Sequence, residues 1–143
     1  MSQIISLRRY YASRLLWNQW KNLACPVQKL FFEKKLMNLK RYSRQVNLPE
    51  IGMEGQQCLQ RASVLCVGVG GLGSPTALYL AAAGVGKIGL IDSDSVDISN
   101  LQRQILFGTS DEGAPKALCG KTKLAHLNPE IEILAYNERL THK

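Results

Sequence analysis

The chain has 143 residues, of which 45% are hydrophobic, so it is long and apolar enough to form one domain with a core. Its four cysteines are scattered without the spacing of a metal site, which fits a reducing compartment. No apolar run reaches the roughly 18 residues that a membrane span requires, and no secretory signal is visible.

The formal net charge of +7 belongs entirely to the N-terminal segment. Residues 1–40 hold eight basic residues and one acid (8 − 1 = +7), whereas residues 41–143 hold ten of each sign. Three interpretations of this segment stay open: an organelle-targeting presequence, a basic and aromatic surface for nucleic acid or an anionic membrane, and an inert or mis-assigned start with Met37 as the natural first residue.

We therefore divide the chain into a basic extension of unknown role, residues 1–39, and a folded domain, residues 40–143. We expect neither nucleic acid nor a membrane as a partner. The expected location is the cytoplasm, or an organelle matrix or stroma if the extension is a presequence.

The predicted domain begins with two short helices, residues 41–48 and 55–61, separated by Pro49 and Gly52. A valine-rich apolar run, residues 63–69, then predicts a strand buried on both faces. The next helix has Pro75 in its first turn, where a missing N–H costs nothing, and Gly84 as its expected C-cap.

A glycine turn, residues 68–73, joins this strand to this helix and reads Gly68-Val69-Gly70-Gly71-Leu72-Gly73. Glycines allow a sharp turn and a close approach of the backbone to a phosphate, whose charge the helix N-terminus favours. By itself the pattern also fits a tight turn with no ligand. No Gly-Lys-Ser/Thr follows, so the turn is not a P-loop of the Walker type.

An acidic run follows the second predicted strand, residues 87–91. Asp92 comes 19 residues after Gly73 (92 − 73 = 19), a distance that suits a carboxylate receiving ribose hydroxyls. Asp94 is either a loop residue or a ligand that holds Mg²⁺ together with phosphates. Asp97 is expected to be structural, as a cap of the turn that carries Ser99 and Asn100.

Two basic residues are candidates for phosphate binding. Arg103 lies beyond the second strand, at the edge of the sheet where ligands bind in open α/β folds, and Lys116 begins the next helical stretch. For both, the alternative is an ordinary surface charge. Gly120 and the β-branched Thr122 interrupt the stretch after Lys116, so we expect a damaged helix before a third strand, residues 131–136.

Seven motifs in this order resemble the ubiquitin-activating-enzyme-like adenylyltransferases of the ThiF/MoeB/HesA type. The resemblance covers residues 40 to 138, and residues 1–39 match nothing in that family. The motifs are Arg41-Tyr42-Ser43-Arg44-Gln45, Leu48-Pro49-Glu50-Ile51-Gly52 with Gly55-Gln56, the glycine turn, Asp92-Ser93-Asp94, Ser99-Asn100-Leu101-Gln102-Arg103-Gln104, Pro115-Lys116 and Leu127-Asn128-Pro129.

The resemblance implies ATP-dependent adenylation of the C-terminal glycine of a ubiquitin-like sulfur-carrier protein, in molybdenum cofactor or thiamine biosynthesis, with Mg²⁺. It implies catalytic roles for Arg103, Lys116 and Arg44, the last reaching the ATP of the other subunit in a homodimer. The implied nucleotide-binding residues are Gly68, Gly70, Gly71, Gly73, Asp92, Asp94, Asn100, Arg103, Gln104 and Lys116. No protein-only metal site is assigned.

The expected fold is α/β, a Rossmann-like doubly wound parallel sheet in three layers, of which this chain holds the first nucleotide-binding half. The further aspartate that similar enzymes carry beyond the third strand is missing, as are their paired Cys-x-x-Cys motifs. Two alternatives to the adenylation function stay open: an inactive truncated nucleotide-binding fragment and an NAD(P)-binding oxidoreductase module.

Overall fold

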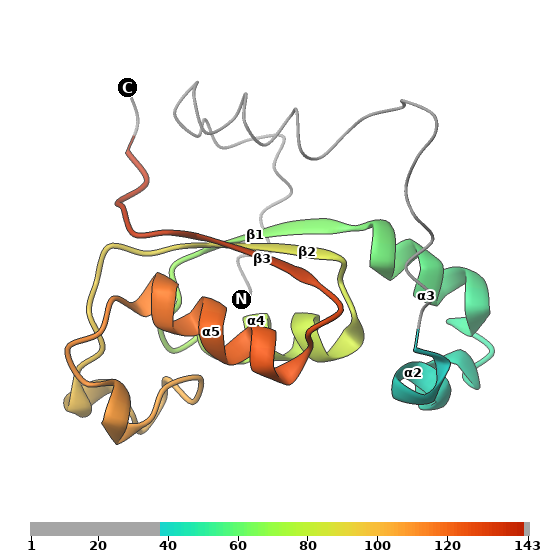
Figure 1. Cartoon of the computed structure of the whole chain (residues 1–143), viewed down its shortest axis with the longest axis horizontal. Coiled ribbons are helices and arrows are strands. Elements are labelled where there is room, and N and C mark those ends of the chain that lie inside the picture. The colour runs from blue at the N-terminus through green and yellow to red at the C-terminus, as the bar shows by residue number, and fades with distance from the viewer. Residues whose placement is uncertain (1–37, 142–143) are drawn as a thin grey trace. The chain divides into compact units, whose positions relative to one another are not determined.

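The computed structural model describes residues 38–141, and residues 38–139 of these belong to one compact unit, to which this account is confined. Two helices come first, and from β1 onward strands and α-helices alternate along the chain (Figure 1). They are α2 (Leu39–Val46), α3 (Gly52–Arg61), β1 (Ser63–Val67), α4 (Gly73–Ala83), β2 (Lys87–Ile91), the 3-10 turns η1 (Ile98–Asn100) and η2 (Thr109–Asp111), α5 (Lys116–Leu127) and β3 (Glu132–Tyr136).

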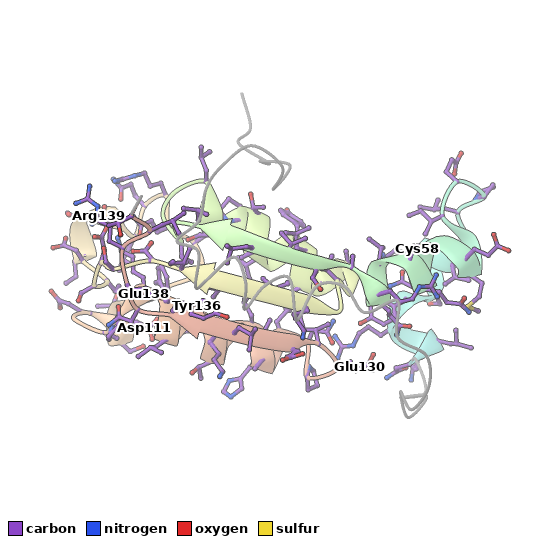
Figure 2. The ribbon with its side chains drawn as sticks, turned by 90° about the horizontal axis from the view of Figure 1, so that it is seen from above. Cys58, Asp111, Glu130, Tyr136, Glu138 and Arg139 are labelled. Carbon is purple, nitrogen blue, oxygen red and sulfur yellow. The ribbon has the colours of Figure 1, made fainter. Side chains whose placement is uncertain are left out.

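The three strands form a parallel sheet in the order β1-β2-β3, which Figure 2 shows from above. Val64 pairs with Ile88, which pairs with Ile133, and this row belongs to the hydrophobic core. Because successive strand residues point to opposite faces, every second row packs against the helices. The predicted β2 is confirmed at its predicted bounds, and β3 begins one residue later than expected.

Helices α4 and α5 cover the same face of the sheet (Figures 1 and 2). Each connects two neighbouring parallel strands, and right-handed crossovers in a constant direction place both helices on one side. The α/β Rossmann-like class is confirmed, but residues 38–139 form two layers of secondary structure rather than the three expected. The predicted cap of α4 is confirmed, since Gly84 adopts φ 85° in the left-handed region.

Strand β1 differs from the expectation of a strand buried on both faces. It ends at Val67 rather than residue 69, and Val67 is 56% exposed. Among the described residues β1 pairs with β2 alone, so its other edge lacks a neighbouring strand. An apolar run predicts burial in a complete sheet, and the edge position accounts for the difference.

Helix α5 is intact from Lys116 to Leu127, so the expectation of a damaged helix is wrong. Gly120 is buried, and a Cβ at this position would lie 3.0 Å from Leu90 Cδ1 and 3.2 Å from Leu106 Cδ2. The glycine therefore permits close packing of α5 on the sheet, which offsets its poor helix propensity of about 1 kcal/mol.

Helices α2 and α3 are joined to the C-terminal end of α4 by buried side chains. Asn128 Nδ2 donates to Tyr42 Oη (2.8 Å) and to Ala81 O (2.7 Å), and Gln56 Nε2 donates to Ala83 O (2.9 Å). Ala83 O is one of the carbonyls that the end of a helix leaves without a backbone partner, whereas Ala81 O also accepts the N–H of Gly84 at 3.1 Å. Gly52, expected in the break between the two helices, is instead the first residue of α3.

None of the helices between residues 38 and 141 has the length and apolar character that crossing a membrane requires. Cys66 is buried in the core, as predicted, and burial raises the pKa of its thiol to about 11. Cys58 and Cys119 are free thiols, and Cys25 and His142 lie outside the described residues.

Candidate functional site

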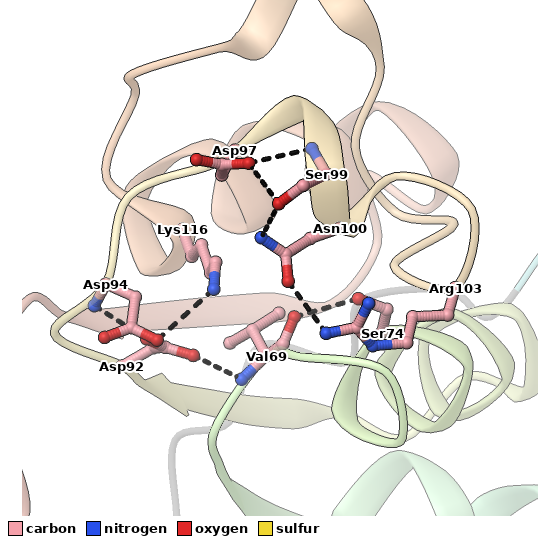
Figure 3. A network of polar contacts seen from close by, with 9 residues as sticks. All are labelled: Val69, Ser74, Asp92, Asp94, Asp97, Ser99, Asn100, Arg103 and Lys116. Atoms are coloured by element: carbon pink, nitrogen blue, oxygen red, sulfur yellow. Dashed lines mark hydrogen bonds and ion pairs between the residues drawn. The ribbon is translucent and has the colours of Figure 1, made fainter.

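Most of the predicted site residues come together at the carboxyl edge of the sheet (Figure 3). The glycine turn follows β1, Asp92 and Asp94 follow β2, and Lys116 begins α5. Parallel strands bring their carboxyl ends to one edge, where open α/β folds bind ligands. The polar network drawn in Figure 3 therefore occupies the place at which this fold class carries its sites.

The glycine turn presents unpaired backbone donors. Within residues 38–141, the N–H groups of Gly70, Gly71 and Leu72 have no hydrogen-bond acceptor, whereas Gly68 N–H donates to Ile91 O at 2.8 Å. Helix α4 begins directly after them at Gly73. Unpaired N–H groups at a helix N-terminus attract an anion, so the turn fits a phosphate group.

Two glycines of the turn are required by geometry. Gly68 has φ 84°, a conformation that side chains with a Cβ rarely adopt. A Cβ on Gly73 would lie 2.0 Å from Gly68 O, which is far inside van der Waals contact. The turn therefore closes on itself because both positions are glycine.

Asp92 clamps the glycine turn to the loop that follows β2. Its Oδ2 accepts the N–H of Val69 at 2.7 Å, and its Oδ1 accepts the N–H of Asp94 at 2.8 Å. A carboxylate has about four acceptor positions, so each oxygen keeps capacity for a further donor. The structure thus gives Asp92 a role in the fold that the spacing argument did not predict, and leaves it able to receive ribose hydroxyls.

Lys116 is buried, which rules out the surface-charge interpretation of this residue. Its side chain is 6% exposed, and Nζ lies 3.3 Å from Oδ2 of Asp94, whose own side chain is 70% exposed. The backbone joins the same two residues, because Lys116 N–H donates to Asp94 O at 2.9 Å. The loop after β2 therefore fixes the start of α5.

Asp97 caps η1, as predicted. Its Oδ1 accepts the N–H of Ser99 at 2.8 Å, and the Ser99 hydroxyl donates to the same oxygen. These hydrogen bonds hold the pKa of Asp97 below its usual range. The capped turn presents Asn100, whose Oδ1 accepts a hydrogen bond from Arg103 Nη2 at 2.8 Å.

Arg103 lies over the glycine turn. A Cβ on Gly71 would be 3.3 Å from Arg103 Cδ, so the guanidinium stem runs along the turn while Asn100 holds its head. Gln104 is 4% exposed, and its Nε2 would be 3.7 Å from a Cβ on Gly70. Gln104 Oε1 is buried with no partner in the described part of the chain, so this residue supports the turn from inside.

Arg44 is the one predicted site residue that the structure does not bring to this edge. It is exposed on α2, whose neighbour Gln45 donates to Ala83 O at the C-terminal end of α4. Eleven helical residues separate that end from the glycine turn, which is about 16 Å. Figure 2 shows the two ends of the sheet, with Cys58 of α3 toward one end and Tyr136 of β3 at the other.

Sequence reasoning missed Ser74 as a site residue. Its side chain is fully buried, and Oγ donates to Val69 O at 2.8 Å, directly behind the glycine turn. The signal available in the sequence was a small hydroxyl residue at the start of a helix that follows glycines. Ser74 and Asp92 hold Val69 through its carbonyl and its N–H, so the turn is fixed from both sides.

The assembled groups can bind a phosphorylated ligand. The turn supplies free N–H groups, Arg103 lies over it, and Lys116 is linked to it through Asp94 and Asp92. The site contains three carboxylates (Asp92, Asp94 and Asp97) against these two cations, so it has a net charge of −1 (2 − 3). A polyphosphate would therefore need further positive charge from an ion or another subunit.

Proteins with similar sequences and folds indicate the family of this chain. The sequence matches the ThiF family over residues 42–143. It is 53% identical to the sulfur carrier protein adenylyltransferase of Thermus thermophilus over 103 residues, which cover 72% of this chain and 38% of that protein. It is 45% identical to the pig adenylyltransferase and sulfurtransferase MOCS3 over 141 residues, covering 97% of this chain and 31% of that protein.

The alignment with the pig protein extends into residues 1–39, which corrects the expectation that the basic extension matches nothing in the family. The fold is similar to the crystal structure of Escherichia coli MccB with ATP, with a TM-score of 0.65 and 33% identity over 73% of this chain and 32% of that one. The chain thus spans about a third of the length of these proteins.

Proposed function

Because the chain belongs to the ThiF family, we propose that it carries the nucleotide-binding half of an enzyme that adenylates the C-terminal glycine of a ubiquitin-like sulfur-carrier protein. The carrying observation is the glycine turn with three free N–H groups, covered by Arg103 and clamped by Asp92. Relatives with this domain are sulfur carrier adenylyltransferases, and an MccB structure contains ATP.

In this proposal the phosphates of ATP bind the glycine turn and the ribose binds Asp92. The free N–H groups of Gly70 and Gly71 donate to phosphate oxygens, and Arg103 meets them from above with its guanidinium oriented by Asn100. The carboxylate of Asp92 keeps its bonds to Val69 N–H and Asp94 N–H and accepts ribose hydroxyls with its remaining lone pairs.

The chemical step is attack of the carrier's terminal carboxylate on the α-phosphorus. A carboxylate oxygen forms a bond to phosphorus, the bond from phosphorus to the bridging oxygen breaks, and pyrophosphate leaves with that electron pair. The residues of this chain have no covalent role. Arg103 and Lys116 neutralise charge on the phosphates, and the turn holds the α-phosphorus in line with the attacking oxygen.

Magnesium is a proposed cofactor, and the donor chemistry of the site fits it. The Asp94 carboxylate is a hard oxygen ligand with its side chain 70% exposed next to the phosphate turn. Mg²⁺ commonly takes one or two carboxylates together with substrate phosphates and water. Bound there, the ion would add two positive charges to a site whose own side chains have a net charge of −1.

We also propose that the enzyme is a homodimer in which Arg44 serves the site of the other subunit. Within its own subunit Arg44 is next to Gln45, which contacts the C-terminal end of α4, and the length of α4, about 16 Å, separates that end from the glycine turn. A second copy could bring this exposed cation to the site, whose own side chains have a net charge of −1. Such an arginine acts like the finger that some phosphoryl-transfer enzymes receive from a partner.

Carrier-dependent exchange of pyrophosphate into ATP tests the proposal. The purified 143-residue chain is incubated with Mg²⁺, ATP, labelled pyrophosphate and a ubiquitin-like carrier that ends in Gly-Gly. Exchange above background, lost in Arg103→Ala and kept in Arg61→Ala at the far end of the sheet, is the expected result. A folded chain that binds ATP but shows no exchange would refute the adenylation activity and favour an inactive nucleotide-binding fragment. A preference for NAD over Mg·ATP would favour an oxidoreductase module.

Mixing two inactive variants tests the dimer. In a heterodimer of the two variants, the Arg44→Ala subunit still has Arg103, and its partner, the Arg103→Ala subunit, still has Arg44. One of the two sites is therefore intact, and the other lacks both arginines. Equal mixing makes half of the dimers heterodimers with one intact site of two, so about a quarter of the wild-type exchange should return. No recovery from a mixture that has exchanged subunits would show that Arg44 does not act across the interface.

A further inference from the structure

The buried ammonium of Lys116 has more hydrogen-bonding capacity than its surroundings use. Its described side-chain partner is Asp94 Oδ2 at 3.3 Å, whereas charge-assisted bonds are usually about 2.7–2.9 Å. An ammonium has three donors, so two have no partner among residues 38–141. Burying a lysine is costly unless it is well paired, and Lys116 is therefore placed to receive a further anion.

The carboxylate of Asp94 can change its partner without disturbing the backbone. Asp94 N–H donates to Asp92 Oδ1 at 2.8 Å, and Asp94 C=O accepts the N–H of Lys116 at 2.9 Å. Both bonds are independent of the Asp94 side chain, which is 70% exposed. The loop is thus held by its main chain, and the side chain is left with the one long contact to Lys116.

On the basis of the proposed function, we propose that the Asp94 carboxylate exchanges partners when nucleotide binds. Lys116 Nζ leaves the Asp94 carboxylate for a phosphate oxygen, and the released carboxylate becomes a ligand of the Mg²⁺ that accompanies the phosphates. Asp94 thereby gives the site a preference for Mg·ATP over free ATP.

The electrostatics of the exchange follow from the charges of these three groups. Without Mg²⁺, the Asp94 carboxylate repels the phosphates and competes with them for Lys116. With Mg²⁺, the same carboxylate attracts the ion that the phosphates hold. A residue with only a structural role would change the affinity for both forms of the nucleotide equally.

The test is the affinity of the full 143-residue chain for ATP, measured by isothermal titration calorimetry in EDTA and again in Mg²⁺. Asp94→Asn keeps the shape and both backbone bonds but removes the charge. We expect Asp94→Asn to bind ATP in EDTA about three- to tenfold more tightly than wild type and to gain correspondingly less from Mg²⁺. Glu112→Gln, which removes the same charge from an exposed loop, should behave like wild type.

A second pair of variants assigns the effect to Lys116. In the Lys116→Gln background there is no ammonium to compete for, and only the repulsion between Asp94 and the phosphates remains. Adding Asp94→Asn to this background should therefore increase the affinity for ATP in EDTA by a smaller factor than it does in the wild-type chain. Circular dichroism confirms folding of each variant, and Asp94→Ser replaces Asp94→Asn if the latter does not fold. An unchanged affinity, or an equal loss with and without Mg²⁺, would overturn the exchange.

The outcomes separate this inference from the proposed function. The expected magnesium dependence in a chain without carrier-dependent exchange would refute the adenylation function alone. Suppose that the wild-type chain shows exchange activity and that Asp94→Asn leaves the magnesium dependence of ATP affinity unchanged. That result would refute the inference alone. Failure of the folded wild-type chain to bind ATP in either buffer would refute both.

Discussion

Replacing Gly73 with alanine tests whether the glycine turn depends on a close backbone approach. The added Cβ would lie 2.0 Å from Gly68 O and 2.9 Å from Gly68 C. Ordinary contact begins at 3.4 Å, so the two backbone segments must move apart by about 1.4 Å (3.4 − 2.0). Gly68 is held to the sheet by its N–H bond to Ile91 O at 2.8 Å, so the strain falls on the turn itself.

Two opposing effects set the size of the change. Alanine favours a helix over glycine by up to about 1 kcal/mol, whereas forcing an atom into a packed region costs about 1–3 kcal/mol or more. Because the clash is with backbone, which cannot rotate away, the cost lies at the upper end of that range, and we expect a net loss of about 2 kcal/mol (3 − 1). That corresponds to a melting temperature lower by about 10 °C for a domain of this size.

Thermal unfolding followed by circular dichroism measures this loss, with Gly70→Ala as the matched control. The nearest atom to a Cβ on Gly70 is Gln104 Nε2 at 3.7 Å, which is ordinary contact, so its stability should stay within about 1 kcal/mol of wild type. Calorimetry should also show that Gly73→Ala loses ATP binding, because the free N–H groups are displaced. A Gly73→Ala protein with wild-type melting would refute the close approach.

Three further changes probe the described contacts. In Asp92→Asn an amide can satisfy only one of two N–H groups, so urea unfolding should show a loss of about 1–3 kcal/mol, and an unchanged midpoint would contradict the clamp. Asn128→Ala removes buried bonds to Tyr42 and Ala81 and should cost about 2–4 kcal/mol in the same assay; wild-type stability would show that they contribute little. The Cys66 thiol has its pKa raised from 9.0 to about 11 by burial, so the unfolded thiol ionises first, and the free energy of unfolding should fall between pH 9 and 11 by about 2–3 kcal/mol more in wild type than in Cys66→Ala. Parallel pH curves would mean that this thiol is not buried.

Several features of this fold could be predicted from the sequence because they depend on neighbours along the chain. The glycine pattern marks the turn, Gly84 ends α4 in the left-handed conformation, and the apolar run of β2 ends at Ile91, directly before Asp92, as expected. Asp97 caps η1 through Ser99, two residues away. Turn chemistry and capping act over a few residues, so the local sequence contains what is needed to predict them.

Other features depend on which elements meet in space. Gly120 reads as a flaw in an isolated helix, but α5 packs so closely on Leu90 and Leu106 that a larger side chain there would displace their Cδ atoms. Val67 reads as a buried strand residue, but its place at the edge of the described sheet leaves it 56% exposed. In both cases the burial of the residue depends on which distant segments lie beside it, and propensity and periodicity do not contain that information.

The same distinction between local sequence and tertiary contacts applies to the candidate site. The groups available at the carboxyl edge follow from the order of residues along the chain: a glycine turn, acids after β2, and the cations Arg103 and Lys116. Their pairing depends on contacts between distant segments, which bury Lys116 against Asp94 and direct both oxygens of Asp92 to backbone N–H groups. Tertiary contacts also place Arg44 at the far end of α4. Chain order fixes the chemistry that each segment carries, whereas crossover connections and core packing fix the distances between segments.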